Sequence, residues 1–128
     1  MKEIRLHGRG GQGVVTAAEL IAQAAFIDGK YAQAFPSFGS ERMGAPVLSF
    51  VRISDNVIRS RNQIHNPDCL IIQDSTLLKS KELVTGLKPG GSIIIDTSRD
   101  AEAFGLDIEG EIFTIPASKM ARAIIGRP

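Results

Sequence analysis

The stretch KEIRLHGRGGQGVVTAAELIAQAAFI (residues 2–27) decides the fold, because it joins a strand pattern to a helix pattern through a glycine-rich loop. Polar and apolar residues alternate over residues 2–7, which predicts a first strand. The alanine-rich sequence after the loop has apolar residues at helical spacing and is followed by Gly29, so a helix is predicted over residues 12–28. Between them, HGRGGQG (residues 7–13) contains four glycines in seven residues.

The rest of the chain continues the same alternation of strands and helices. Strands are predicted at residues 31–35, 47–53 and 111–115, and residues 57–61 are predicted to return as the second strand of a hairpin around a turn at 54–56. The apolar runs CLIIQ (69–73) and SIIID (92–96) are typical of strands buried on both faces of a parallel sheet. Helices are predicted at 76–87 and 117–125. These elements predict an α/β fold: a single Rossmann-like domain over residues 1–128, with a mostly parallel sheet flanked by helices and a β-hairpin insertion.

Composition excludes several classes of protein. A chain of 128 residues with 43% hydrophobic residues is expected to form one globular domain. Its one cysteine excludes a disulfide framework and an iron–sulfur cluster held by this chain alone. A formal net charge of +1 gives no attraction to nucleic acid. Without a membrane-length apolar run or a secretory signal, no membrane partner and a cytoplasmic location are expected.

The glycine loop is the strongest functional signal in the sequence. Gly8, Gly10 and Gly13 satisfy GxGxxG between a predicted strand and a predicted helix, the setting in which this pattern binds phosphate. Backbone N–H groups at a helix N-terminus suit an anionic oxygen. A tight strand-to-helix turn is the alternative, but the adjacent Gly11 and the polar Arg9 and Gln12 favour a phosphate. We therefore interpret residues 8–13 as a phosphate-binding loop.

The loop does not identify the ligand that carries the phosphate. A dinucleotide fold is expected to place an acidic residue about 20 residues beyond the glycines, yet no carboxylate lies between Gly29 and Ser40. An NTP-hydrolysing loop requires Lys and Ser or Thr directly after its last glycine, where this chain has Val14 and Val15. Binding of NAD and hydrolysis of NTP are both disfavoured.

A second loop, PSFGSERMGAP (residues 36–46), mixes hydrogen-bonding groups with apolar anchors. It is predicted either to bind a ligand or partner or to form an ordinary surface loop, and its candidate residues are Ser37, Ser40, Glu41, Arg42 and Met43.

Weaker candidates each have an ordinary structural interpretation as well. The histidines lack metal-ligand spacing, the cysteine opens an apolar strand, and the two arginines lie on one face of the predicted return strand. The aspartates end apolar strands, where sites gather but where turn and N-cap residues are also common. These residues are His7, His65, Cys69, Arg59, Arg61, Asp74 and Asp96.

Three segments carry a resemblance to a known family: RGGQGVVTAAELIAQAA (9–25), QAFPSFGSERMGAPVLSFVRIS (33–54) and PDCLIIQDSTLL (67–78). In this order they resemble the gamma subunit of the 2-oxoacid:ferredoxin oxidoreductases, first among them those that act on pyruvate. The resemblance implies a complex that decarboxylates a 2-oxoacid on thiamine diphosphate, passes electrons through iron–sulfur clusters to ferredoxin and transfers the acyl group to coenzyme A. The chain is then an oxidoreductase subunit of anaerobic metabolism, inactive alone.

The resemblance also implies how cofactors and partners are divided. Thiamine diphosphate, magnesium and the iron–sulfur clusters belong to other subunits, with alpha, beta and delta subunits as partners, while this chain binds none of these cofactors alone. The glycine loop and the second loop are then expected on the coenzyme A side of the active site, and relatives are expected to continue past Pro128 with a helical segment. A free-standing nucleotide- or flavin-binding module remains the alternative.

Overall fold

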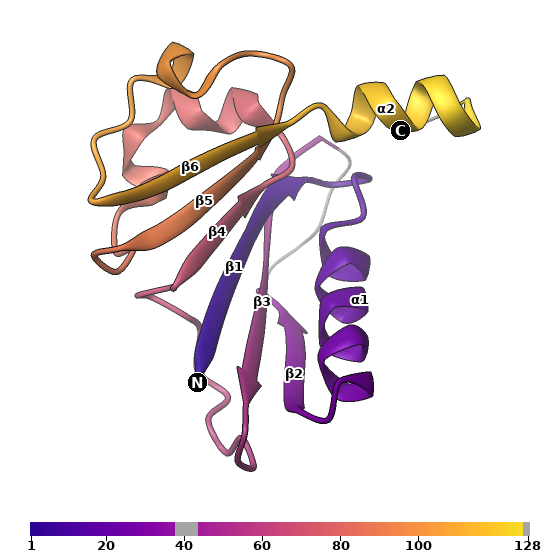
Figure 1. The fold of residues 1–128 in the computed structure, drawn as a ribbon, viewed down its shortest axis with the longest axis vertical. Coiled ribbons are helices and arrows are strands. Elements are labelled where there is room, and N and C mark those ends of the chain that lie inside the picture. The colour runs from indigo at the N-terminus through magenta and orange to yellow at the C-terminus, as the bar shows by residue number, and fades with distance from the viewer. Residues whose placement is uncertain (38–43, 127–128) are drawn as a thin grey trace.

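The computed structural model describes residues 1–37 and 44–126, and its main feature is a six-stranded sheet in the order β2-β3-β1-β4-β5-β6 (Figure 1). None of the helices in these two ranges is long and apolar enough to cross a membrane. The strands are β1 Lys2–Arg9, β2 Tyr31–Pro36, β3 Pro46–Ser54, β4 Cys69–Ile72, β5 Gly91–Asp96 and β6 Gly110–Ile115. The helices are α1 Val14–Ile27, α2 Ala117–Ile125, and the short 3₁₀ helices η1 Ser75–Lys79, η2 Lys81–Val84 and η3 Ala101–Phe104.

The sheet combines parallel and antiparallel strands. β1, β4, β5 and β6 run parallel, whereas β3 lies antiparallel between β1 and β2. The predicted α/β class with a mostly parallel sheet is therefore confirmed. Helix α1 begins at Val14, two residues later than predicted, because Gly13 has a left-handed backbone conformation (φ 74°) that cannot continue a helix.

The predicted hairpin of residues 47–61 is wrong in its second strand. β3 forms as expected, but both of its edges are occupied, since Val51 pairs with Ile4 of β1 and with Ala34 of β2. A strand at 57–61 would therefore find no free edge of β3. Residues 57–61 lie outside the sheet, and β2 supplies the antiparallel neighbour instead.

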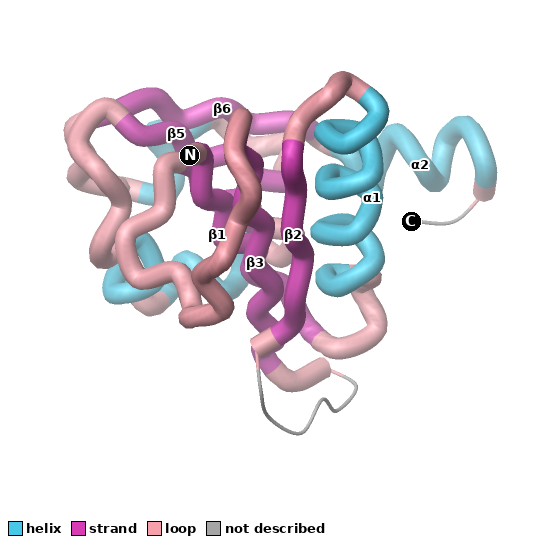
Figure 2. Tube along the Cα trace, turned by 90° about the horizontal axis from the view of Figure 1, so that it is seen from below, coloured by secondary structure: helices cyan, strands magenta, loops and turns pink. Residues whose placement is uncertain are grey.

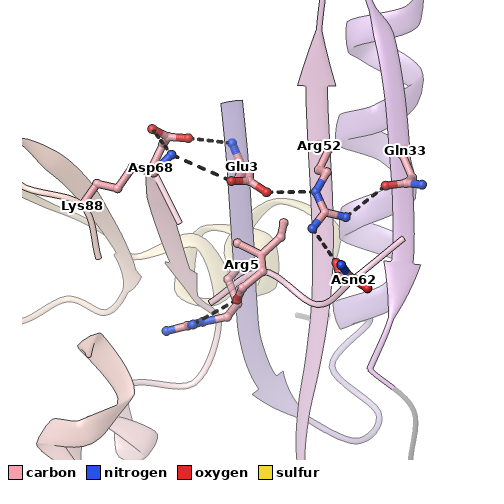
Figure 3. A network of polar contacts seen from close by, with 8 residues as sticks. Glu3, Arg5, Gln33, Arg52, Asn62, Asp68 and Lys88 are labelled. Carbon is pink, nitrogen blue, oxygen red and sulfur yellow. Dashed lines mark hydrogen bonds and ion pairs between the residues drawn. The ribbon is translucent and has the colours of Figure 1, made fainter. Parts of the chain in front are cut away.

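Two arginines hold the segment after β3 against the sheet, as Figure 3 shows in part. Arg52 is 3% exposed, forms an ion pair with Glu3 at 2.9 Å and donates a hydrogen bond to the carbonyl oxygen of Asn62. Arg5 donates to the carbonyl oxygen of Ile64 at 3.3 Å. Buried charges are tolerated when they are paired and hydrogen-bonded in this way. These contacts explain how an irregular segment covers the sheet face opposite α1.

The predicted helix at 76–87 is also wrong. The segment forms η1 and η2, which are separated by an extended residue, Ser80 (φ −89°, ψ 110°). Leu78 and Leu83 both pack on the cluster over β4 and β5. In one continuous α-helix, side chains five residues apart would point about 140° away from each other. The break lets both leucines face the sheet.

Hydrophobic clusters lie on both faces of the sheet. On one face α1 packs along β1, β2 and β3 around a cluster of Leu6, Val14, Ala18 and Val51 (Figure 2). The second cluster lies on the opposite face. Successive side chains of a strand point to opposite faces of a sheet, and Ile71 packs against the first cluster whereas its neighbours Leu70 and Ile72 belong to the second. Its members are Leu70, Ile72, Leu78, Ile93, Ile95 and Phe104.

Candidate functional site

The glycine loop joins the carboxyl end of β1 to the amino end of α1, and its glycines meet separate requirements. Gly11 and Gly13 have φ values of 91° and 74°, in the left-handed region that disfavours other residues. At Gly8 a Cβ atom would lie 2.4 Å from Cγ2 of Val14, so this glycine lets the helix pack closely on the strand. The turn geometry therefore explains part of the GxGxxG spacing.

The N-terminus of α1 is open to an anion. Gly13 is its N-cap residue, no side chain within residues 1–37 and 44–126 caps the helix, and the first turn contains no acidic residue. The N–H groups of a first turn have no partner within the helix and carry partial positive charge. An anionic oxygen is stabilised at such a position.

A cavity of about 480 Å³ lies beside the loop. Gly11 and Gln12 line it from the loop, and its apolar lining includes Ile71, Ile94 and Ile115. It is located where β4, β5 and β6 end, at the carboxyl edge where open parallel sheets bind ligands. Its volume falls within the range of small-molecule sites, roughly 300 to 1,000 Å³.

Besides Gln12, four polar side chains line the same cavity: Gln73, Asp96, Ser118 and Arg122. Asp96 accepts hydrogen bonds from the backbone N–H of Ser118 at 3.1 Å and from its hydroxyl at 2.5 Å, so it ties the start of α2 to the end of β5. The Oε1 atom of Gln73 is buried and has no hydrogen-bond partner among residues 1–37 and 44–126. Because buried acceptors are normally satisfied, this atom is suited to an N–H or O–H donor of a bound molecule or water.

Arg9 and Gln12 of the glycine loop both contact Asp74, which follows β4. Arg9 Nε lies 3.3 Å from Asp74 Oδ2, and the two terminal nitrogens of Arg9 donate to Gly44 O and Thr76 Oγ1, each at 3.1 Å. Gln12 Nε2 donates to Asp74 Oδ2 at 2.9 Å, and Gln12 Oε1 accepts from Arg9 N at 2.8 Å. Arg9 and Gln12, both predicted to bind phosphate, therefore contact the carboxylate of Asp74, which the sequence analysis considered only as a separate candidate.

Asp74 carries its negative charge at neutral pH. Burial by itself would raise the pKa of this carboxyl group, but hydrogen bonds from Thr76 and Gln12 and the charge of Arg9 outweigh burial and lower the pKa below its ordinary value. Asp74 also caps η1, because it accepts a hydrogen bond from the backbone N–H of Thr76.

The two predicted loops meet in the structure. Gly10 N donates to Ala45 O at 2.8 Å, and Gly44 N donates to Gly10 O at 3.1 Å. The end of the second loop therefore lies directly against the glycine loop. Ser37 follows β2 and continues its pairing through a hydrogen bond from its N–H to Leu48 O. The other candidates of this loop, Ser40, Glu41, Arg42 and Met43, lie outside the described residues.

The weaker candidates have structural explanations. His7 is 6% exposed and accepts a hydrogen bond from Arg5 Nε at 2.9 Å; burial, followed by the charge of Arg5, lowers the pKa of His7 to about 3. Burial and the charge of Asp68 raise the pKa of the Cys69 thiol, which keeps it protonated. Three candidates are exposed and lie outside the strands: His65, Arg59 and Arg61.

Sequence reasoning missed Gln73, Ser118 and Arg122 as residues of one cavity. Gln73 had a usable signal, because it directly follows the apolar run of β4 at the edge where ligands bind. Ser118 and Arg122 had none, since only the position of α2 beside β5 brings them to this edge.

The fold and the site define a class: an α/β protein with a glycine loop and an open helix N-terminus beside a cavity at the carboxyl edge of its sheet. The protein-family model for pyruvate ferredoxin/flavodoxin oxidoreductase matches residues 3–128. The chain belongs to this family.

Individual relatives point to one type of subunit. The chain is 52% identical to pyruvate synthase subunit PorC of Methanosarcina barkeri, over all of this chain and 70% of that protein. It is 46% identical to the pyruvate/ketoisovalerate oxidoreductases common subunit gamma of Thermococcus litoralis, over all of this chain and 71% of that protein. The crystal structure of pyruvate oxidoreductase subunit PORC from Thermotoga maritima matches with a TM-score of 0.85 at 38% identity, covering 98% of this chain and 67% of that one. The predicted resemblance to gamma subunits and the expectation of an oxidoreductase subunit are confirmed.

Proposed function

We propose that this chain supplies the coenzyme A phosphate-binding loop of a 2-oxoacid:ferredoxin oxidoreductase, with pyruvate as the 2-oxoacid. The complex converts the 2-oxoacid, coenzyme A and oxidised ferredoxin into acyl-CoA, CO₂ and reduced ferredoxin, with two electrons passing to ferredoxin. The observation that carries this proposal is the cavity beside the N-terminus of α1, where the N-cap residue is Gly13, in a chain of this family.

In this proposal the electron-transfer and decarboxylation chemistry belongs to alpha, beta and delta subunits of a cytoplasmic complex, with neither nucleic acid nor membrane as a partner. Thiamine diphosphate, magnesium and the iron–sulfur clusters would be held there. Residues 1–37 and 44–126 contain no group of three or more His, Cys, Asp or Glu able to hold a metal ion. We assign no step of the chemistry of these groups to this chain.

The cavity suits the chemistry of coenzyme A. Its diphosphate would accept hydrogen bonds from backbone N–H groups between Gly10 and Gly13 and from the first turn of α1. The apolar surface of Ile71 and Ile94 would contact uncharged parts of the ligand, and Gln73 Oε1 would accept from one of its N–H or O–H groups. The second-loop residues Ser37, Ser40, Glu41, Arg42 and Met43 would complete the site or contact another subunit.

Calorimetric titration of coenzyme A into the assembled complex tests this proposal with the substitution Gly11→Val. Gly11 lines the cavity with a φ of 91°, so a valine would both obstruct the cavity and disturb the loop. We expect the dissociation constant to rise at least about tenfold, equivalent to about 1.4 kcal/mol. Unchanged affinity would refute the proposed site.

Gly90→Val is the matched control for this titration. Gly90 has a comparable φ of 81°, no atom of residues 1–37 and 44–126 lies within 4 Å of a Cβ placed there, and it is not among the residues that line the cavity. It should impose a similar backbone strain without changing the affinity for coenzyme A. Purification of this chain alone in a yellow or nucleotide-loaded form would instead favour a free-standing flavin- or nucleotide-binding module.

A further inference from the structure

Asp74 places a negative charge beside two side chains of the glycine loop, Arg9 and Gln12. Its carboxylate is held by four donors: Thr76 N at 3.0 Å, Thr76 Oγ1 at 2.5 Å, Gln12 Nε2 at 2.9 Å and Arg9 Nε at 3.3 Å. Two of these donors belong to the glycine loop itself. In this arrangement the carboxylate of Asp74 binds the side-chain donors of the loop, Arg9 and Gln12.

The donors to Asp74 come from two segments of the chain: Thr76 lies in η1, whereas Arg9 and Gln12 lie in the glycine loop. Thr76 is two residues from Asp74 and belongs to η1, so its hydrogen bonds keep the carboxylate in place whatever the loop does. Arg9 and Gln12 belong to a different segment, more than 60 residues away along the chain. If Arg9 and Gln12 turn toward a ligand, Asp74 keeps its two hydrogen bonds from Thr76.

A phosphate at the glycine loop would compete with Asp74 in two ways. It would take over Arg9, whose side chain is 34% exposed and accessible to a ligand. It would also be repelled by the fixed carboxylate, since like charges only a few ångströms apart are unfavourable even where water screens them. Both effects weaken anion binding as long as Asp74 is charged.

We propose that Asp74 is a positioning residue that sets the anion affinity of the glycine loop: it holds Arg9 and Gln12 until a phosphate-bearing ligand takes over these donors. The inference rests on the proposed function, because it assumes that coenzyme A is the ligand whose phosphate approaches the loop. It adds the prediction that an acidic residue beside the loop opposes binding.

The test is the substitution Asp74→Asn in the assembled complex, with steady-state kinetics at varied coenzyme A concentration. Asparagine still caps η1 but carries no charge. We expect the KM for coenzyme A to fall about 3- to 10-fold with kcat unchanged, and the difference to shrink at high ionic strength. Asp100→Asn removes the same charge from an exposed position outside the cavity and should leave KM unchanged.

A second pair of variants shows whether Asp74 acts through Arg9. Asp74→Asn should lower the KM for coenzyme A by a smaller factor when it is introduced together with Arg9→Ala, relative to Arg9→Ala alone, than when it is introduced into the unchanged chain. The factors differ because the two residues are coupled. Asp74→Ser also retains a capping oxygen without charge and repeats the test if the asparagine variant does not fold.

A KM that stays the same or rises in the uncharged variants would overturn the inference. The proposed function fails separately, if Gly11→Val leaves the affinity for coenzyme A unchanged.

Discussion

One row of side chains crosses the sheet on the face that α1 covers, and the two ends of the row have different surroundings. The strand register places Ser49, Leu6, Ile71, Ile94 and Phe113 side by side, from β3 to β6. Ser49 and Leu6 are fully buried, whereas Phe113 is 49% exposed. Ser49 and Leu6 form the covered end of the row and Phe113 forms its open end, although both ends lie on the same face of the same sheet.

The helices that cover the sheet, and not the apolar pattern of the strands, determine which strand side chains are buried in this protein. Helix α1 packs on β1, β2 and β3, while α2 has no buried side chain. On the opposite face the 3₁₀ helices cover β4 and β5, where Ile93 and Ile95 are fully buried. The apolar runs of β4 and β5 predicted burial on both faces; at Ile71 and Ile94, on the α1 side, the structure shows only partial burial.

Among the variants that test this comparison, Leu6→Ala should lower the free energy of unfolding most. Leu6 is fully buried under α1, so its truncation removes apolar contacts and leaves a cavity. We expect a loss of about 2–5 kcal/mol in the free energy of unfolding. Urea denaturation followed by circular dichroism measures this loss, and a value below about 1 kcal/mol would contradict the close packing of Leu6 under α1.

Gly8→Ala tests how closely the covering helix approaches β1. The new Cβ would lie 2.4 Å from Val14 Cγ2, so we expect about 1–3 kcal/mol of destabilisation by overpacking. The double variant Gly8→Ala/Val14→Ala should recover part of this loss, because it removes the clashing methyl group. Destabilisation that is the same with and without Val14 would show that the close contact is not the cause.

Phe113→Ser should have the smallest effect. The side chain is 49% exposed at the open end of the row, so little buried apolar area is lost. We expect a change within about 1 kcal/mol, well below that of Leu6→Ala, because surface substitutions are usually tolerated. Thermal unfolding of the two variants side by side measures the contrast, and equal destabilisation would show that the open end is covered in solution.

Local patterns predicted the first strand and helix well. Alternation over residues 2–7 and helical spacing after residue 13 are properties of neighbouring residues, and the structure has β1 and α1 there. The glycine loop was also readable, because a left-handed conformation at Gly11 and Gly13 favours glycine whatever the surroundings.

Elements whose form depends on distant partners were predicted less well. Residues 57–61 have strand composition, but β2 and β1 already occupy both edges of β3. Residues 76–87 have helical composition, but packing of Leu78 and Leu83 on the same face breaks the helix at Ser80. In both cases tertiary contacts outweighed local propensity.

By itself the sequence determined the α/β class, the glycine loop and the resemblance to oxidoreductase gamma subunits, because periodicity, turn chemistry and motif order are carried by residues close together in the chain. Only the tertiary structure decided that Asp74 meets Arg9 and Gln12, and that Gln73 shares a cavity with Arg122. The physical reason is the strand order: β1 lies beside β4, and β4 beside β5, so the carboxyl ends of segments far apart in sequence meet at one edge of the sheet.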